Sequence, residues 1–298
     1  MNVIWINDNN FVSLNEKLCC AIGNFDSVHL GHQQLIKKSK EFNLKSAVLT
    51  FYPHPFTILK KMNPYPQVTP IAHKIKIIES MGVDYLFIVE FTKDVANMDK
   101  LDFIKHLKDL GIVSVVCGYD FTFGKQASGT IKDLALYFDF HEIPKFQINN
   151  IRVSTTYVKE LLTNGDLENV KVMLGRNFDL YGKVIAGKKL GRQLGFPTAN
   201  IDYGIYYLPK NGVYAVKVTH NNKTYLGMAN IGYNPTVEYS ENVKLEVNIF
   251  DFAESIYGEE LHIEFFTRIR SEKKFKNTSE LEEQLEKDKT NIINYFKD

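Results

Sequence analysis

Residues 19–32 have the sequence CCAIGNFDSVHLGH, and this stretch decides the fold of the first half of the chain. The apolar run predicts a buried parallel strand, Gly23 predicts a turn, and a helix is expected to start near Leu30. A helix N-terminus offers free N–H groups and a partial positive charge. The junction therefore suits a bound phosphate.

His29 and His32 lie three residues apart at that helix start, and Gly31 between them allows a ligand to approach the backbone closely. Two imidazoles there would stabilise charge that grows on a phosphate during its displacement. For a bare His-x-Gly-His pattern, the alternative is two histidines on an amphipathic helix. The glycine turn, the acidic Asp26 and the strand-to-helix context favour the phosphate site.

The segment from Gly23 to His32 resembles the His-x-Gly-His signature of nucleotidyltransferases. Within that superfamily, residues 50–55 (TFYPHP) and 118–124 (GYDFTFG) resemble the bacterial bifunctional riboflavin kinase/FMN adenylyltransferases, also called FAD synthetases. The resemblance spans nearly the whole chain. It implies an α/β nucleotidyltransferase domain with a Rossmann-like parallel sheet, then a riboflavin kinase domain built as an antiparallel β-barrel with a C-terminal helix.

Composition sets limits that do not depend on the resemblance. The 298 residues suffice for two domains, and 44% hydrophobic with 24% charged residues is ordinary for a soluble globular protein. A net charge of +1 leaves no excess positive charge for a nucleic-acid backbone. Cys19, Cys20 and Cys117 form no Cys-x-x-Cys pair, so reduced, buried thiols in a cytoplasmic protein are expected. Neither a signal peptide nor a membrane helix is expected.

Between about residues 17 and 141, short apolar runs alternate with helical segments, which predicts a parallel sheet covered on both faces. Expected strands are 18–22, 46–51, 85–91, 113–117 and 138–143, and expected helices are 30–42, 71–81, 101–110 and 131–137. Ligands bind such sheets at the carboxyl ends of the strands. Polar residues follow three of these strands, so a nucleotide site is expected at that edge.

The loops after the second and fourth of these strands carry further candidates. His54 stands between Pro53 and Pro55, whose rings suit neither a helix nor a central strand, so the alternative is a plain loop with an exposed histidine. Asp120 follows Gly118, and the nearby aromatic residues either join the core or flank a flat ring. The resemblance implies that His54 binds flavin and that Asp120 faces the nucleotide.

Residues 152–156 (RVSTT) precede an amphipathic stretch, where hydroxyl groups are an ordinary N-cap device. In the superfamily, this position carries a mobile loop that touches the triphosphate. Thr155 stands where the family has serine, Lys159 where it has arginine, Gln126-Ala127 where Gly-Arg is more usual, and Ser27 where glycine is common. Lysine keeps the charge of arginine but loses its bidentate geometry, so these departures bear on the efficiency of adenylyl transfer.

The resemblance implies two sets of residues for adenylyl transfer. His29 and His32 are the expected catalytic residues. The residues expected to bind ATP phosphates are Gly23, Asn24, Phe25, Asp26, Asp120, Arg152, Thr155, Thr156 and Lys159.

The second half of the chain begins with short helices around residues 164–177, which indicate a connector. Alternating segments at 180–185, 213–218, 224–228, 245–249 and 261–265 predict antiparallel strands, and their glycine, asparagine and proline loops suggest a closed barrel. A final helix is expected, with a capping box of Ser279 and Glu282 and an apolar stripe comprising Leu281, Leu285, Ile292 and Phe296. The expected domains are 1–165 and 179–298, joined by 166–178.

The chemistry of this half is expected in two places. Gly187, Gly191 and Gly195 alternate with the basic Lys188, Lys189 and Arg192, which predicts a loop able to wrap phosphate, although ordinary turns look the same. Residues 195–200 (GFPTAN) follow, where Thr198 can give a hydroxyl to Mg²⁺ and Asn200 can reach phosphate or metal. This segment resembles the Pro-Thr-Ala-Asn motif of riboflavin kinases, and residues 227–232 and 234–236 also match that family.

Glu246 alternates with apolar neighbours on one strand, and from this pattern alone a solvated glutamate is the better interpretation. The resemblance implies that it is the general base that takes the proton from the terminal ribityl hydroxyl of the flavin. Asn248 stands where the family usually has histidine. Asn230 and Arg270 are the expected flavin-binding residues, the latter in a loop that closes over flavin.

Three functions therefore compete. The first is phosphorylation of riboflavin to FMN followed by adenylylation of FMN to FAD, with Mg²⁺, and with ATP, riboflavin and FMN as small-molecule partners. The second is the kinase step alone, and the third is a non-catalytic flavin- or nucleotide-binding regulator. Retained Glu246, His29 and His32 argue against the regulator. Neither a nucleic-acid nor a membrane partner is expected. The chain is expected to be a monomer or a weak homo-oligomer.

Overall fold

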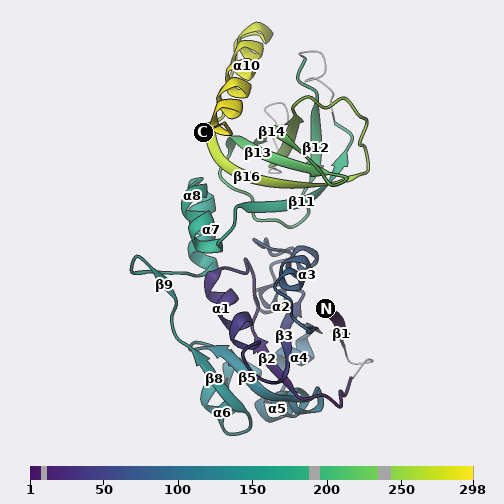
Figure 1. The fold of residues 1–298 in the computed structure, drawn as a ribbon, viewed down its shortest axis with the longest axis vertical. Helices are drawn as coiled ribbons and strands as arrows, with labels where there is room; N and C mark the ends of the chain where they lie inside the picture. The colour runs from purple at the N-terminus through teal and green to yellow at the C-terminus, as the bar shows by residue number, and fades with distance from the viewer. Residues whose placement is uncertain (8–11, 188–194, 234–242, 298) are drawn as a thin grey trace. The chain divides into compact units, whose positions relative to one another are not determined.

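Figure 1 shows the computed structural model of the chain, which describes residues 1–7, 12–187, 195–233 and 243–297. The chain divides into two compact units, Met1–Thr155 and Thr156–Asp298. The first contains a parallel sheet and the second a closed barrel.

A six-stranded parallel sheet forms the centre of the first unit, as the alternating pattern predicts. In the order β1-β4-β3-β2-β5-β8, its strands are Asn2–Ile6, Tyr85–Glu90, Lys45–Tyr52, Leu18–Ile22, Ile112–Gly118 and Asp139–Ile143. The chain moves outward from β2 through β3 and β4, then returns to the opposite side of β2 with β5. Ligands bind open parallel sheets at the carboxyl ends of the strands beside such a reversal.

Helices cover both faces of this sheet (Figure 1). Helices α1 (Leu30–Lys38) and α3 (Ile71–Ser80) pack on one face, and α5 (Lys100–Asp109) and α6 (Ile131–Ala135) on the other. Cys19 and Cys20 are successive residues of β2 and point to opposite faces of the sheet, since each belongs to a different core. All three cysteines are buried and free.

The apolar pattern of the sequence does not predict several short elements of the first unit. They are β1, β6 (Thr122–Phe123), β7 (Gly129–Thr130), β9 (Gln147–Ile148), β10 (Ile151–Arg152), α2 (Pro55–Leu59), α4 (Lys93–Asn97) and η1 (Lys125–Ala127). The prediction that the prolines around His54 exclude a helix is wrong, because Pro55 is the first residue of α2. The N–H of a first helical residue has no intrahelical partner, so proline loses nothing there.

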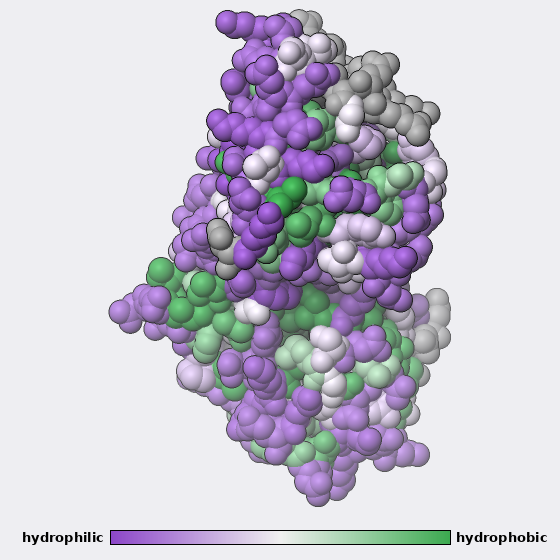
Figure 2. All heavy atoms as spheres, turned by 45° about the horizontal axis from the view of Figure 1, so that its top comes forward, coloured by the Kyte–Doolittle hydropathy of each residue, from purple (hydrophilic) through white to green (hydrophobic). Residues whose placement is uncertain are grey.

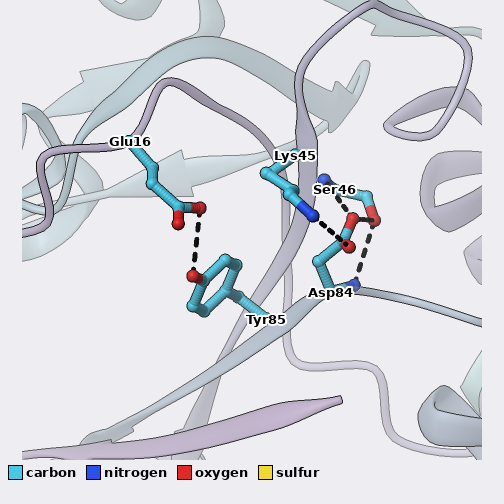
Figure 3. A network of polar contacts seen from close by, with 5 residues as sticks. All are labelled: Glu16, Lys45, Ser46, Asp84 and Tyr85. Carbon is cyan, nitrogen blue, oxygen red and sulfur yellow. Dashed lines mark hydrogen bonds and ion pairs between the residues drawn. The ribbon is translucent and has the colours of Figure 1, made fainter.

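Hydrogen bonds join the amino-terminal ends of β3 and β4, at the edge opposite the carboxyl ends (Figure 3). The Asp84 carboxylate accepts the hydroxyl of Ser46 at 2.7 Å and its backbone N–H at 2.9 Å, and Lys45 Nζ lies 3.4 Å from the same carboxylate. The bonds from Ser46 lower the pKa of Asp84. Tyr85 donates its hydroxyl to Glu16 at 3.0 Å, which raises the pKa of that phenol.

A closed antiparallel barrel forms most of the second unit, which confirms the predicted barrel. In the order β11-β12-β15-β14-β13-β16, its strands are Phe178–Ile185, Thr198–Asp202, Lys244–Ile249, Lys223–Gly232, Gly212–His220 and Glu260–Arg270, and β16 pairs with β11 to close it. The apolar pattern does not predict β12, because Thr198 and Asn200 put polar groups on one side of it.

Two helices precede the barrel, α7 (Thr155–Asn164) and α8 (Leu167–Leu174). Helix α8 contacts β11 and β16 and buries four apolar residues, Leu167, Val170, Met173 and Leu174. Gly175 ends it with a φ of 71°, a conformation that favours glycine. The segment expected to be a connector thus packs on the barrel as a helix.

Helix α10 (Thr278–Tyr295) ends the chain and contacts β14 and β16. Ile292 is fully buried there, and Leu285 and Phe296 are partly buried against the same cluster, as the apolar stripe predicts.

The start of α10 differs from the expectation. The capping box predicted at Ser279 and Glu282 is wrong, because Asn277 is the N-cap and accepts the backbone N–H of Glu280 at 2.9 Å. The Glu280 carboxylate accepts the backbone N–H of Lys276 at 3.0 Å in return. Asparagine caps a helix as well as serine does, and here the N-cap lies two residues before the predicted Ser279.

Hydrophilic residues cover much of the face drawn in Figure 2, and apolar residues gather there in smaller patches. Among the residues that the structure describes, no helix is both long and apolar enough to cross a membrane.

Candidate active sites

The turn after β2 has an uncommon backbone. Phe25, Ser27 and Val28 have φ angles of 48°, 74° and 41°. Such backbone costs roughly 1–3 kcal/mol for each residue that carries a Cβ, and it persists only where packing enforces it. All three side chains are fully buried. Turns of this kind can aim successive N–H groups at one point and so form a concavity for anions.

His29 and His32 stack on each other at the start of α1, with ring centroids 3.6 Å apart. Nδ1 of His29 accepts the backbone N–H of His32 at 3.0 Å, which leaves Nε2 to carry the proton of a neutral His29 ring. Burial lowers the pKa of His32 well below its ordinary value, and the charges of His29 and Lys74 lower it further. His32 is therefore a neutral imidazole near neutral pH.

Gly31 makes room for one of these rings. A Cβ at this position would lie 3.1 Å from the ring of His29. The glycine of the motif thus serves packing between its own residues, whereas the sequence suggested that it admits a ligand to the backbone.

Asp26 and Thr155, both predicted to bind phosphate, meet in the structure. Thr155 donates its hydroxyl to the backbone oxygen of Asp26 at 2.7 Å, and the Ser27 hydroxyl lies 3.2 Å from the same oxygen of Thr155. The carboxylate of Asp26 is buried and accepts the backbone N–H of Thr69 at 3.1 Å. These contacts tie the turn to two other segments of the first unit.

Lys74 of α3, which sequence analysis did not single out, lies beside the same turn. Its Nζ donates to the backbone oxygen of Asn24 at 2.6 Å and lies 3.4 Å from the hydroxyl of Thr50. The side chain is 1% exposed. Burial lowers the pKa of Lys74 to about 8, against the opposing effect of the Asp26 charge.

His54 follows β3 and caps α2. Its Nδ1 accepts the backbone N–H of Phe56 at 3.2 Å, and its ring stacks on Tyr65 with centroids 4.3 Å apart. The alternative of an exposed loop histidine is wrong, because this stacking and capping leave His54 only 6% exposed.

Asp120 and Arg152, two further phosphate candidates, form an ion pair with each other. Asp120 follows β5 and Arg152 lies on β10, where its guanidinium carbon is 5.3 Å from the ring centroid of Tyr119. Both side chains are exposed. An exposed ion pair contributes at most about 1 kcal/mol, so Arg152 can exchange this partner for a phosphate at little cost.

Thr156 and Lys159 lie on α7 and belong to the second unit. Lys159 Nζ lies 5.2 Å from the ring centroid of Tyr207. Their contacts with phosphate remain predictions.

A cavity of about 220 Å³ lies beside the β1–β4 edge of the sheet, and its wall includes Asn7 and Glu90 at the carboxyl ends of these two strands. Leu49, Met98 and Phe103 supply apolar parts of the wall. No sequence motif pointed to this cavity, because its wall combines strands with the short helix α4 that the pattern did not predict.

In the barrel, strand register brings the kinase candidates together. Glu246 of β15 pairs with Asn200 of β12 on one side and Asn230 of β14 on the other. Directly opposite residues of antiparallel strands point to the same face, with Cβ atoms about 4.5–5.5 Å apart. Thr198 shares this face, since it lies two residues before Asn200. Because both sequence neighbours of Glu246 are buried in the barrel, the face is the outer one.

The row extends to Arg270, which is the last residue of β16 and does not lie in a loop as expected. Val213 of β13 pairs with Asn230 on one side and Arg270 of β16 on the other, so both flavin candidates lie in the same row as Glu246. Arg270 Nε donates to the carboxylate of Asp288 at 2.8 Å, and Asp288 is 1% exposed on α10. The C-terminal helix thus holds the guanidinium group of Arg270 through its Nε. We name Asn200, Glu246, Asn230, Val213 and Arg270 the outer row.

Gly187 and Asn248 hold the start of β12 in place. A Cβ at Gly187 would collide with the side-chain amide of Asn200, so a larger residue there would have to displace that amide. Asn248 donates its amide to the backbone oxygen of Pro197 at 2.7 Å and pairs with Thr198 across the strands. Asn248, which stands where the family usually has histidine, therefore fixes the backbone of this segment by a hydrogen bond.

The rest of the predicted basic loop is only partly described. Gly195 has a φ of 74° with open space around it. Lys188 and Gly191, and with them Lys189 and Arg192, lie outside the described residues.

Two family models match the chain. A model described as FAD synthetase matches residues 12–157, and one described as riboflavin kinase matches residues 174–296.

Curated relatives match over nearly the whole chain. "Bifunctional riboflavin kinase/FMN adenylyltransferase" of Bacillus subtilis (strain 168) is 40% identical, over 94% of this chain and 93% of its own length. The protein of the same name from Listeria monocytogenes is 39% identical, over 93% and 91%, and that of Escherichia coli (strain K12) is 32% identical, over 93% and 92%.

A solved structure described as "Crystal Structure of Macrolide-efflux Protein from Streptococcus pneumoniae" shares the fold over 97% of this chain and 98% of its own, with a TM-score of 0.87 and 29% identity.

Proposed function

Since the chain belongs to the bifunctional riboflavin kinase/FMN adenylyltransferase family, we propose that it phosphorylates riboflavin to FMN and then adenylylates FMN to FAD. ATP is the co-substrate of both steps, and pyrophosphate leaves in the second. We assign adenylyl transfer to residues 1–165 and the kinase to 179–298. The observation that carries this proposal is the outer row, in which a carboxylate stands between two asparagines of neighbouring strands.

In the kinase step, the Glu246 carboxylate takes the proton of the terminal ribityl hydroxyl as its oxygen attacks the γ-phosphorus of ATP. The hydroxyl is a weak nucleophile, so a positioned base accelerates its attack. Asn230 and Arg270 hold the flavin along the outer row, and Thr198 and Asn200 meet the phosphates. ADP is the leaving group, and no covalent enzyme intermediate is needed.

In the adenylyl step, an FMN phosphate oxygen attacks the α-phosphorus of ATP and pyrophosphate leaves. The attacking phosphate is already anionic and needs no base. The work of the protein is therefore to stabilise negative charge that develops on the phosphates. Two imidazoles donate hydrogen bonds to these phosphates. His29 donates through Nε2–H, because its Nδ1 accepts the capping bond, and His32 donates as a neutral ring. The N–H groups of the turn and of α1 donate beside them.

We propose that the cavity beside β1 and β4 receives the isoalloxazine ring of FMN. Its volume of about 220 Å³ and its wall of Leu49, Met98 and Phe103 suit a flat, largely apolar ring. Strand β3, which His54 follows, lies next to β4 in the sheet, so the ribityl phosphate would run past His54 toward the turn after β2.

Mg²⁺ is the metal that this donor set fits. The Thr198 hydroxyl and Asn200 carbonyl are hard oxygen donors on the same face as the Glu246 carboxylate. Among the described residues, no cluster of three His, Cys, Asp or Glu side chains could hold a metal. An ion that is bound mainly by ATP phosphates and water agrees with this donor set. When present, Mg²⁺ would neutralise phosphate charge.

The test is to incubate the purified chain with riboflavin, ATP and Mg²⁺, and to resolve FMN and FAD by chromatography over time. FMN should appear first, and FAD with pyrophosphate should follow. FMN that accumulates without FAD would support the kinase-only alternative, and a folded chain that forms neither product would support a non-catalytic binder.

A further inference from the structure

Lys74 is a lysine that the protein keeps away from water. It lies on α3, its side chain is 1% exposed, and neither the motifs nor the proposed chemistry uses it. Burying an ammonium group is costly unless it is well paired. A role for its charge must therefore be sought in its contacts.

Those contacts converge on one backbone carbonyl. The oxygen of Asn24 accepts Lys74 Nζ at 2.6 Å and the hydroxyl of Thr50 at 3.0 Å. Nζ also lies 3.4 Å from that hydroxyl. The three groups therefore form a closed set at the point where β2 and β3 end and the phosphate turn begins.

This set fixes the direction of the turn. The peptide between Asn24 and Phe25 is trans, so its carbonyl and its N–H point in opposite directions. A carbonyl held toward Lys74 turns the N–H of Phe25 away from the lysine. Phe25 is also the first residue of the turn with a positive φ, at 48°. The anchored peptide thus sets the starting orientation of the whole left-handed segment.

The charge of Lys74 acts on the same groups. The titratable residues whose charges interact with that of Lys74 are Asp26 of the turn and His32 of α1. The attraction of Asp26 favours the protonated lysine, and the lysine charge disfavours a proton on His32.

We propose that Lys74 is a positioning residue for adenylyl transfer, whose ammonium anchors the Asn24 carbonyl so that the turn after β2 presents its N–H groups to the ATP phosphates. The proposal rests on the proposed function of this turn. It adds a residue that touches neither substrate and acts through the backbone.

The test compares Lys74→Met with Lys76→Met, which replaces an exposed lysine on the same helix. FAD formation from supplied FMN and ATP is measured for both, with FMN formation from riboflavin as an internal control in the same chain. We expect kcat/KM for FAD formation to fall about 100-fold in Lys74→Met, the scale of a misplaced binding group. FMN formation should stay within about twofold, and Lys76→Met should match the wild type in both reactions.

A pH profile separates positioning from mere support of the fold. In the wild type, FAD formation should decline as pH rises through about 8, because the neutral amine formed there donates a weaker, uncharged hydrogen bond to the carbonyl. Lys74→Met should lack that decline. A profile that stays flat from pH 7 to 9.5 in the wild type overturns the proposal even if Lys74→Met does not fold.

Two other results are decisive. If the wild type forms FAD and Lys74→Met forms it at the rate of Lys76→Met, Lys74 has no part in the reaction. If the wild type forms no FAD, the proposed function of the turn fails, and this proposal fails with it.

Discussion

The turn after β2 and the outer row of the barrel are built in opposite ways. The turn holds Phe25, Ser27 and Val28 in left-handed backbone, and a buried lysine and buried aromatic packing enforce that shape. In the outer row, Glu246 and the two asparagines beside it lie on paired strands, and the strand register aligns them. A site built on strained backbone depends on residues that never touch substrate. A site built on register depends mainly on the residues that do.

The two sites also differ in the chemistry that they must supply. A ribityl hydroxyl has to lose a proton before it is a good nucleophile, so the barrel needs a base. An FMN phosphate is already an anion, so the turn needs only donors and positive charge. With the proposed functions of the two sites, this accounts for a carboxylate at the centre of the outer row and for two stacked imidazoles and a helix N-terminus at the turn.

Removing the base should have the largest effect and should leave the other site untouched. Glu246→Gln keeps the shape of the side chain but cannot accept a proton, so FMN formation should fall about 10²–10⁴-fold. FAD formation from supplied FMN should stay at the wild-type rate. Steady-state assays of both half-reactions check this, and near-normal FMN formation would remove Glu246 from the mechanism.

A smaller change tests whether register really suffices in the barrel. In Gly187→Ala the new Cβ collides with the amide of Asn200 and should displace it from the outer row. We expect kinase turnover to fall by up to about 100-fold, the loss that a displaced group near the reacting atoms produces. Gly204→Ala is the control: a Cβ there meets open space, and the strain at its φ of 57° costs stability without displacing Asn200. Equal kinase rates in the two variants would mean that Asn200 is not held by this packing.

The smallest effect is expected from a substitution of Asp84, which lies at the amino-terminal ends of the strands, opposite the turn after β2. Hydrogen bonds from Ser46 lower the pKa of Asp84, so their stabilisation is full above the ordinary carboxyl range and is lost as pH falls through the lowered pKa. Because Asp84 is 39% exposed, Asp84→Asn should cost less than about 1 kcal/mol of unfolding free energy at pH 7.

Urea unfolding at pH 7 and pH 3 measures this contribution. The difference between wild type and Asp84→Asn should shrink at the lower pH, and Lys45→Met, which removes the weaker partner at 3.4 Å, should cost less than Asp84→Asn. Neither activity should change at pH 7. A loss of FAD formation in Asp84→Asn would show that the turn depends on the opposite edge as well.

The sequence predicted the parts of this fold that apolar periodicity controls. Strand β2 was expected at 18–22 and lies at Leu18–Ile22, because it is buried on both faces and has no polar residue. Strand β12 was missed for the opposite reason, since Thr198 and Asn200 turn polar groups outward where substrate is expected. The same polar residues, Thr198 and Asn200, are the candidates for substrate contact and the reason that the apolar pattern did not predict β12.

The support of the turn was beyond the reach of sequence patterns. Lys74 does share a helical stripe with Ile71 and Ile78, which was the one available signal that it faces inward. Its partner is a backbone carbonyl 50 residues away in sequence, and no residue pattern records such a contact. Some predicted motif residues meet in the structure, such as Asp26 with Thr155, whereas the contact of Lys74 with the backbone of the turn is visible only in three dimensions.

The central claim is that two independent sites, one in residues 1–165 and one in residues 179–298, carry the two reactions. The most direct test mixes two inactive chains, Glu246→Gln and His32→Ala, and supplies riboflavin, ATP and Mg²⁺. Alone, the first should form FMN about 10²–10⁴-fold more slowly than the wild type, and the second should accumulate FMN with FAD formation reduced about 10²–10³-fold. Mixed, they should form FAD, because FMN released by one chain is adenylylated by the other. No FAD in the mixture, from two folded chains that each retain the other half-reaction, would contradict the claim.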